Sequence, residues 1–339
     1  MMINDEHDKM TFTADDLSAR PQAVPDEDFR SGFIGLIGRP NVGKSTLLNH
    51  LAGMHVAITS PKPQTTRHLI QAVLNEEKSQ MIFLDTPGMH QPRTRLGSSM
   101  KAAVKTAIRQ ADVIVILVDA KAATGPKAYK GIPDAENEII VMAQSRHVPT
   151  ILVFNKVDHV KKETLLPLIS LYSQAYQFDA ILPISARTGD GSKLLLREIR
   201  RLLPKGPPLF PADMITDQTE RGLASELIRE QLLYQTEQEI PHGIAVDIEQ
   251  FDEQLHQETG ERQQVSIHAV IYCEKDSHKG IIIGKKGAML KAIGTSARQH
   301  IEQMLDCPVY LELFVKVRED WRNRPGMLRS LGYDRHDQK

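Results

Sequence analysis

The sequence predicts a first domain of the α/β class, with a mixed, mostly parallel sheet, followed by a smaller α+β domain. From residue 32 to about residue 203, short β-branched runs alternate with longer helical stretches, which is typical of a sheet that helices cover on both faces. A glycine-rich turn follows the first of these runs, at residues 38–45. A proline-rich stretch at residues 204–211 ends the alternation, because proline cannot continue a helix. We therefore expect the domain boundary there.

Six runs within residues 30–203 have the composition of strands. The second and third are separated only by residues 75–79, which is short enough for a hairpin, so we expect one antiparallel edge strand. The six runs are Phe33–Ile37, Leu69–Leu74, Met81–Leu84, Val113–Val118, Thr150–Phe154 and Ile181–Ile184.

An extended proline-rich linker over residues 204–216 is expected to lead into the second domain, residues 217–339. A helix should begin near Asp217, whose side chain caps the first turn together with Glu220 three residues on. The remaining elements of this domain are strands at residues 244–248, 265–272 and 309–317, with helices on both sides of residues 284–287.

Charge is distributed unevenly along the chain. The net charge is −1, yet residues 1–29 hold eight acidic side chains against Lys9 and Arg20 and so sum to −6, which leaves +5 for the rest. Because this leader has few aliphatic residues and no periodic pattern, we expect a disordered acidic segment. It has neither a positively charged start nor an apolar stretch, so we do not expect a signal peptide.

The composition also limits the class of protein. A length of 339 residues suits two domains. The longest apolar run, Val113–Val118, is far too short to span a bilayer. Cys273 and Cys307 stand without the spacing of metal ligands, and we expect reduced, structural thiols. These features predict a cytoplasmic protein, which we expect to be a monomer.

The glycine-rich turn has the pattern G-x-x-x-x-G-K-[ST] of a phosphate-binding loop. A strand that feeds such a turn into a helix points several backbone N–H groups and the helix N-terminus at one anion. Lys44 should reach the outer phosphates of a nucleotide, and Ser45 should ligate Mg²⁺. The predicted phosphate-binding residues are Gly38, Arg39, Pro40, Asn41, Val42, Gly43, Lys44, Ser45 and Thr46.

Two further segments should meet the Mg²⁺ and the outer phosphate. Asp85 directly follows an apolar run, so it is placed to hold Mg²⁺ through water, and the Gly88 N–H is placed to bond the γ-phosphate. The loop at residues 59–67, rich in proline and hydroxyl groups, suggests a switch that is mobile until a threonine hydroxyl joins the Mg²⁺ shell. Thr66 is the predicted ligand, and Thr65 is the alternative.

Guanine specificity is predicted from the ends of two later strands. The carboxylate of Asp158 can accept from both N1–H and the exocyclic amine of guanine, a pair that adenine does not offer. Asn155 precedes it in the N-K-x-D pattern, and Lys156 should lay its aliphatic stem over the base. The pocket is completed by Ser185, Ala186, whose N–H can donate to guanine O6, and Arg187.

The second domain has a G-x-x-G loop between two helical stretches. Such a loop lets the backbone approach nucleic-acid phosphates, and neighbouring aliphatic side chains form a floor for unstacked bases. Residues 277–301 contain five basic side chains and no Asp or Glu, which supports phosphate binding. The predicted RNA-binding residues are Lys279, Ile283, Gly284, Lys285, Lys286, Gly287 and Lys291.

The five nucleotide motifs, in this order, resemble the guanine-nucleotide-binding proteins of the translation-factor-related class. With the proline linker, a KH domain of type II order and a basic tail, they resemble the Era family. That tail comprises Lys316, Arg318, Arg322, Arg324 and Arg329. The acidic leader and an insert at residues 123–130 lie outside the family pattern.

The resemblance implies a P-loop GTPase fold joined to a type II KH domain, and hydrolysis of GTP to GDP and phosphate with Mg²⁺. It implies binding to the 3′ region of small-subunit ribosomal RNA, a role in assembly of the small ribosomal subunit, and peripheral contact with the inner membrane. Two alternatives stay open at this point. One is an RNA-binding module whose GTP site is structural, and the other is a membrane-associated regulator whose basic tail meets anionic lipid.

Signalling GTPases carry a water-orienting glutamine where this chain has Met89, so hydrolysis should be slow alone or depend on another electrophile. Asn41 matches the asparagine that relatives use to hold a monovalent cation, here K⁺, against the phosphates. The alternative for Asn41 is a turn residue, and His90 is a second candidate for ordering water. The predicted catalytic set is Asn41, Lys44, Thr66 and Gly88.

Overall fold

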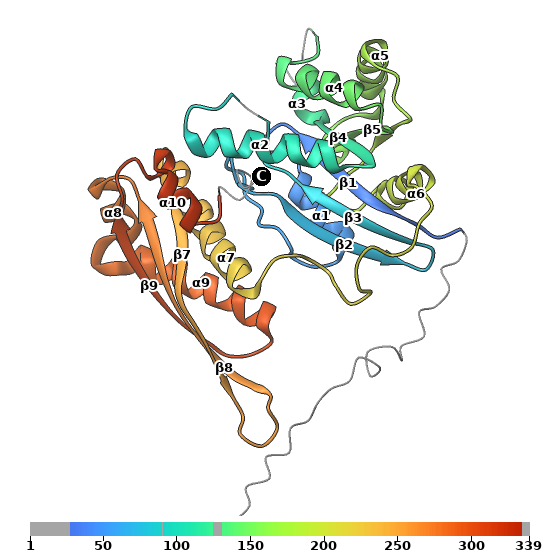
Figure 1. The fold of residues 1–339 in the computed structure, drawn as a ribbon. Helices are drawn as coiled ribbons and strands as arrows, with labels where there is room; N and C mark the ends of the chain where they lie inside the picture. Colours follow the sequence, from blue (N-terminus) through green and yellow to red (C-terminus); the bar gives the residue numbers. More distant parts are fainter. Residues whose placement is uncertain (1–27, 90, 125–130, 334–339) are drawn as a thin grey trace, which may run out of the picture.

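The computed structural model describes residues 28–89, 91–124 and 131–333. Two sheets form the framework, one of six strands and one of three, and helix α7 (Glu220–Gln235) lies between them (Figure 1). The acidic leader, except for its last two residues, lies outside the described residues, as does most of the predicted insert. Within the described ranges, no helix has the length and apolar character needed to cross a membrane.

The six-stranded sheet has the order β2-β3-β1-β4-β5-β6. Only β2 is antiparallel to its neighbour, which confirms the predicted hairpin at one edge. The hairpin is tighter than predicted, because Asn75 and Glu76 continue the ladder opposite Gln80 and Ser79. The strands are β1 (Arg30–Gly38), β2 (Ile70–Glu76), β3 (Ser79–Asp85), β4 (Val113–Asp119), β5 (Thr150–Asn155) and β6 (Ala180–Pro183).

Helices cover both faces of this sheet. Strand β4 shows why its sequence is continuously apolar: Val115 faces one core cluster, whereas the neighbouring Ile116 faces the other. Helices α1 (Lys44–Ala52) and α6 (Ser192–Leu202) cover the first face. The second face is covered by α2 (Arg95–Gln110), α3 (Ala120–Thr124), α4 (Asp134–Arg146) and α5 (Leu165–Ala175).

In the second domain, β7 (Ala245–Leu255) is antiparallel to β8 (Arg262–Cys273), and β9 (Val309–Val317) is parallel to β8. Helices α7, α8 (Asp276–Ile283) and α9 (Ala288–Leu305) contribute to the core that also contains the buried, free Cys273 and Cys307. The predicted order of elements is confirmed. A further helix, α10 (Pro325–Ser330), contributes to a separate cluster with Trp321 and with two side chains of α2 from the first domain.

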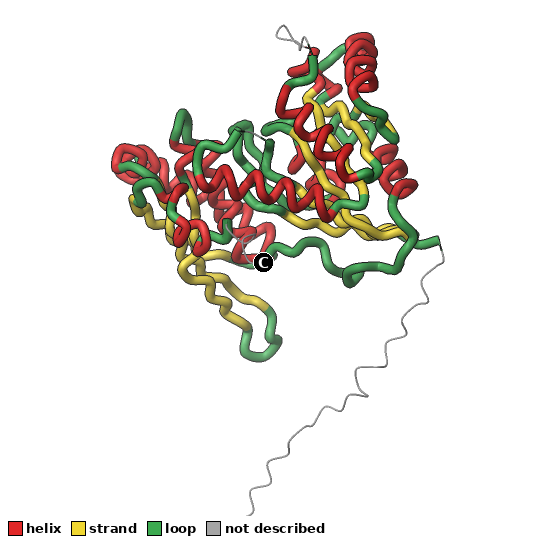
Figure 2. The backbone as a smooth tube through the Cα atoms, turned by 45° about the horizontal axis from the view of Figure 1, so that its top comes forward, coloured by secondary structure: helices red, strands yellow, loops and turns green. Residues whose placement is uncertain are grey.

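The linker is not the free spacer that its prolines suggest. The side chain of Gln80 accepts from the N–H groups of Leu209 and Phe210 at 2.6 and 2.9 Å and donates to the Phe210 carbonyl at 2.8 Å. The Phe210 ring packs edge-on against Phe33 at 6.4 Å between centroids. Figure 2 shows the segment as a loop that passes along the first domain. The linker is therefore part of that domain's surface.

The predicted cap of α7 is wrong. Thr219 is the N-cap, and its Oγ1 accepts from the Gly222 N–H at 3.1 Å. Asp217 is engaged elsewhere, because its Oδ1 accepts from the backbone N–H of Gln71 in strand β2 at 3.1 Å. The side chain of Asp217 therefore bonds a distant strand and does not cap the helix that follows it.

Candidate nucleotide site and its contacts with the second domain

A cleft of about 770 Å³ opens where strands β1 and β3 end. The phosphate loop, residues 58–61 and 64–66, Gly88, Lys156 and Arg187 line it, together with one residue of the second domain. Most of the predicted nucleotide residues are therefore brought to one place. Parallel strands end at a common edge, which is why motifs far apart in the sequence meet here.

Two phosphate-loop positions adopt the left-handed backbone region, Asn41 at φ 62° and Gly43 at φ 99°. Glycine is required at position 43, because a Cβ there would lie 2.3 Å from Nδ2 of Asn155. Gly88 is equally confined, since its Cβ would lie 2.6 Å from the backbone of Pro40. The loop leads directly into α1, which begins at Lys44, so the N-terminus of that helix faces the cleft.

Lys44 is buried, and its Nζ donates to the carbonyls of Gly38 and Arg39 at 3.3 and 3.1 Å. Burial lowers the pKa of Lys44 to about 8, and the nearby carboxylate of Asp85 only partly opposes this. Phosphate groups would stabilise the charged form further. The ammonium group is therefore poised for an anion.

Three oxygen-bearing side chains fit a Mg²⁺ ion. Ser45 Oγ lies 2.6 Å from Asp85 Oδ2 and 2.9 Å from Thr66 Oγ1. The other carboxylate oxygen of Asp85 is buried and has no hydrogen-bond partner among the described residues. Burial raises the pKa of this carboxyl group, whereas Lys44 and the two hydroxyls oppose the rise. Oxygen ligands of this kind, with an acceptor still unused, suit a hard cation.

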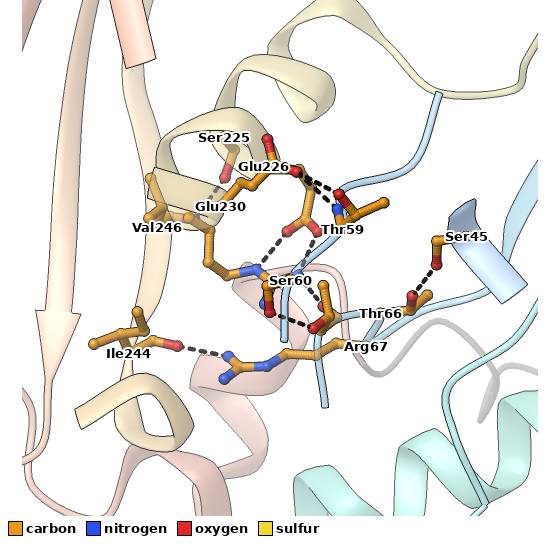
Figure 3. Close-up of polar contacts among 12 residues, drawn as sticks. Ser45, Thr59, Ser60, Thr66, Arg67, Ser225, Glu226, Glu230, Ile244 and Val246 are labelled. Carbon is orange, nitrogen blue, oxygen red and sulfur yellow. Dashed lines mark hydrogen bonds and ion pairs between the residues drawn. The ribbon is translucent and has the colours of Figure 1, made fainter. Parts of the chain in front are cut away.

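The structure distinguishes between the two predicted threonines. Thr65 is held away from Ser45 by its own contacts, 2.7 Å to Ser60 Oγ and 2.7 Å to the Lys62 carbonyl. Thr66 is buried beside Ser45, as Figure 3 shows. Its position favours the predicted metal ligand over the alternative.

Asn155 connects the two loops that are predicted to bind the base with the phosphate loop. Its Oδ1 accepts from the Ala186 N–H at 2.9 Å, and its Nδ2 donates to the Val42 carbonyl at 2.7 Å. Lys156 donates to the Asn41 carbonyl at 2.6 Å and pairs with Asp119 at 2.6 Å. Asp119 was missed by sequence reasoning, although its place at the end of β4, beside β5, was a usable signal.

Asp158 lies in the short helical turn that follows β5. Partial burial raises the pKa of its carboxyl group, but the hydrogen bond from Ser185 and the charge of Arg187 outweigh that effect and hold the pKa below its usual value. The side chain is thus an ionised acceptor at neutral pH, which is the state that recognition of guanine requires.

The structure places two of the three residues that bear on the trigger of hydrolysis, Asn41 and Met89. Nδ2 of Asn41 donates to the Pro61 carbonyl at 2.8 Å, which fixes the amide group whose Oδ1 is the atom able to ligate a cation. Met89 is buried in the core of the first domain, which explains an apolar residue where signalling GTPases have glutamine. His90 lies outside the described residues.

The switch segment, residues 59–67, is held against the second domain (Figure 3). The N–H of Thr59 donates to Glu230 at 2.7 Å, and the guanidinium of Arg229 donates to the Thr65 carbonyl. Arg67 is fully buried, donates to the Ile244 carbonyl at 2.5 Å, and lies over the Trp321 ring at 5.8 Å from its centroid. Sequence reasoning missed these partners, because charged residues in a helix usually indicate a solvated face.

In the second domain, the predicted G-x-x-G loop lies between α8 and α9. Gly284 has φ 71°, and a Cβ there would lie 2.9 Å from the backbone nitrogen of Met289. Lys285 and Lys286 are exposed, and the latter has φ 51°. A groove of about 410 Å³ runs from Gly287 between α9 and β9, and its lining includes Leu290, Lys291, Gly294, Arg298 and Leu313.

The predicted basic tail is less positive than its sequence suggests. Lys316 pairs with Glu249 at 2.9 Å, and Arg322 pairs with Glu274 at 2.6 Å. These acidic partners come from strand β7 and from the residue that follows β8, so only tertiary structure brings them there. Two of the five basic side chains of the tail therefore have their charge paired within the second domain.

Comparison with known proteins gives two family matches. The model of the 50S ribosome-binding GTPase family matches residues 33–156, and that of the KH domain matches residues 239–322. The chain is 46% identical to GTPase Era of Ruminiclostridium cellulolyticum over 305 residues, which cover 90% of this chain and 98% of that protein. It is 48% identical to GTPase Era of Geobacter metallireducens over 310 residues, with 91% and 100% covered.

Two solved structures are similar along most of the chain. One is an Era in complex with MgGDPNP and nucleotides 1506–1542 of 16S ribosomal RNA, with a TM-score of 0.83, 40% identity, and coverage of 90% of this chain and 99% of that one. The other is an Era from Aquifex aeolicus bound to GDP and AlF4⁻, with the same TM-score, identity and coverage.

Proposed function

The chain belongs to the Era family of GTPases, and from that premise we propose a switch in which GTP and Mg²⁺ control how the KH domain meets the 3′ region of small-subunit ribosomal RNA. One observation carries the proposal. Residues 59–67 provide the metal-ligand candidate Thr66 and also contact the second domain through Thr59, Thr65 and Arg67. Ordering of this segment by nucleotide therefore acts directly on the KH domain.

The residues of the cleft have distinct roles in hydrolysis of GTP to GDP and phosphate. Lys44 and the phosphate-loop amides would stabilise charge on the outer phosphates, and the N–H of Gly88 would bond the γ-phosphate. Ser45 and Thr66, with Asp85 through water, would hold Mg²⁺, which neutralises charge that develops in the transition state. Met89 has no group that can orient water, so we expect slow intrinsic turnover.

We further propose that Asn41 Oδ1 holds K⁺ against the phosphates. If so, turnover in K⁺ exceeds turnover in Na⁺ at equal ionic strength, by roughly tenfold for about 1.4 kcal/mol of transition-state stabilisation. The variant Asn41→Ala should turn over GTP at the same rate in K⁺ and in Na⁺. Its GDP affinity should be similar in the two salts, so that a difference in binding does not account for the result. Equal rates for the native chain would contradict the role and return attention to His90 or to an RNA-supplied trigger.

The solved Era complex with a 16S ribosomal RNA fragment supports the choice of RNA. The exposed loop at residues 284–287 and the groove beside α9 are the surfaces that we assign to it in this chain. Loop glycines let the phosphates approach, and Leu290 and Leu313 supply an apolar floor for bases.

The RNA assignment is tested by titration with short RNAs at one fixed salt concentration. An oligonucleotide with the 3′-terminal sequence of the small-subunit RNA should bind roughly tenfold or more tightly than a shuffled one of equal composition, because unstacked bases are read individually. A non-hydrolysable GTP analogue and GDP should give different affinities. Equal binding of both RNAs would contradict the assignment, and crosslinking in cells followed by sequencing would then identify the bound RNA.

A role in small-subunit assembly, a cytoplasmic location with peripheral membrane contact, and the monomeric state stay predictions. Pairing of Lys316 and Arg322 with acidic neighbours gives no support to a lipid-binding tail. Both RNA and anionic lipid present phosphates, so the salt dependence of binding does not distinguish them. Competition between the RNA oligonucleotide and anionic vesicles does.

A further inference from the structure

The KH domain contributes one side chain to the nucleotide cleft. Tyr234, near the end of α7, lines the cleft together with Thr59, Ser60, Lys156 and Arg187. Its exposed fraction is 52%, and it belongs to none of the hydrophobic clusters formed by the described residues. An aromatic ring left this accessible in a cleft is available to pack against a ligand.

Helix α7 is fixed against the cleft by contacts on the same side as Tyr234. Glu230 lies four residues earlier, one helical turn away on the same face, and accepts from Thr59 (Figure 3). Its carboxylate also lies 3.3 Å from Nε2 of His55. Ile58, which lines the cleft, is buried in the core of the second domain beside side chains of α7. The contacts of Glu230 with Thr59 and His55, and the packing of Ile58 beside α7, therefore hold Tyr234 at the cleft.

Exposure alone does not indicate a ligand. Tyr310, on strand β9, is equally exposed at 52%, but it does not line the nucleotide cleft. Its ring instead packs against His268 at 6.3 Å between centroids. The two tyrosines share residue type, domain and exposure, so Tyr310 is a matched control for Tyr234.

We propose that Tyr234 is a nucleotide-contacting residue that the KH domain supplies to the GTPase site, where it packs against the bound guanine nucleotide and slows its release. The contact would be made in the cleft that residues 58–60, Lys156, Arg187 and the phosphate loop also line. This inference rests on the proposed function, because it takes the cleft as the guanine-nucleotide site.

The same helix contacts α9, the helix that follows the RNA-binding loop. Gln231 in α7 lies 3.2 Å from His300 in α9, and α9 begins immediately after Gly287. Tyr234 is thus carried on an element that touches both the nucleotide cleft and the helix behind the RNA loop. A shift of α7 would change the nucleotide contact without any movement of the phosphate loop.

Release of radiolabelled GDP and of a GTP analogue tests the inference in the full chain. Tyr234→Ala should release nucleotide about five- to tenfold faster than the native chain, the range expected for loss of one aromatic contact. Tyr310→Ala should release it at the native rate. If Tyr234→Phe keeps slow release, the ring makes the contact; if it does not, the hydroxyl does. Native release rates in Tyr234→Ala would overturn the inference.

Tyrosine nitration with tetranitromethane, read by mass spectrometry, provides a test without substitution. Bound GDP should protect Tyr234 severalfold and leave Tyr310 unchanged. Unchanged nitration of Tyr234 in a chain that demonstrably binds GDP would refute the contact while leaving the GTPase function intact. Failure of the native chain to bind guanine nucleotides would instead refute the proposed function, so the two failures are distinguishable.

Discussion

Replacing Asp158 with asparagine is expected to weaken GTP binding by roughly 10²- to 10³-fold, which corresponds to about 3–4 kcal/mol. The ionised carboxylate, whose pKa is held below its usual value, accepts from N1–H and from the amine of guanine. An amide presents one acceptor and one donor. Its oxygen can still accept from N1–H, but its NH₂ group faces the guanine amine, so these two donor groups are left without an acceptor. Xanthosine triphosphate has an oxygen in place of that amine, so the variant should bind it better than the native chain does.

Equilibrium titration with both nucleotides measures this exchange of specificity. Asp190→Asn is the matched control, because it removes the same charge from the exposed end of the neighbouring base loop and should leave GTP affinity unchanged. Unchanged GTP affinity in Asp158→Asn, with no gain for the xanthine nucleotide, would exclude Asp158 from the base pocket. A loss for both nucleotides would indicate a local structural defect instead.

Reversing both loop charges, Lys285→Asp with Lys286→Asp, should lower RNA affinity by at least roughly 10²-fold, since each charge changed near a phosphate contributes about 1 kcal/mol. Both side chains are exposed on a loop whose glycine backbone permits close approach of phosphates. Loss of two phosphate contacts should also reduce the slope of log affinity against log salt by about 1.4. GTP affinity should stay near the native value.

The adjacent exposed pair Lys161 and Lys162 in the first domain offers a matched control, because its reversal changes net charge equally. RNA titrations of both double variants separate a local contact from a general electrostatic effect. Equal losses in the two variants would show that the loop has no special role. Native RNA binding in the loop variant would contradict the KH assignment, and lost GTP binding would indicate misfolding.

Much of the architecture could be predicted because it depends on local patterns. Buried parallel strands need apolar residues on both faces, so Val113–Val118 was recognisable without its neighbours. Phosphate-binding loops need glycine where a side chain would collide, as at Gly43. Each of these requirements involves only a few neighbouring residues, so the sequence alone is enough to identify it.

The errors came from segments whose partners are distant. Asp217 has the pattern of a helix cap but bonds Gln71 in β2, and the linker prolines indicate a spacer although Gln80 holds the segment to the first domain. The sequence suggests that Lys316 and Arg322 carry unpaired positive charge. In the fold, Glu249 pairs with Lys316 and Glu274 pairs with Arg322. Each outcome depends on a contact that no local pattern contains.

The sequence by itself determined the two folds, the guanine-nucleotide motifs and the G-x-x-G loop, because each rests on backbone geometry or ligand chemistry that only a few residue types satisfy. The tertiary structure alone decided that Thr66 lies beside Ser45, that Arg67 and Arg229 fasten the switch segment to the KH domain, and that Tyr234 enters the nucleotide cleft. Those relations join residues more than twenty positions apart, so they depend on burial and hydrogen bonding between segments that only the folded chain brings together.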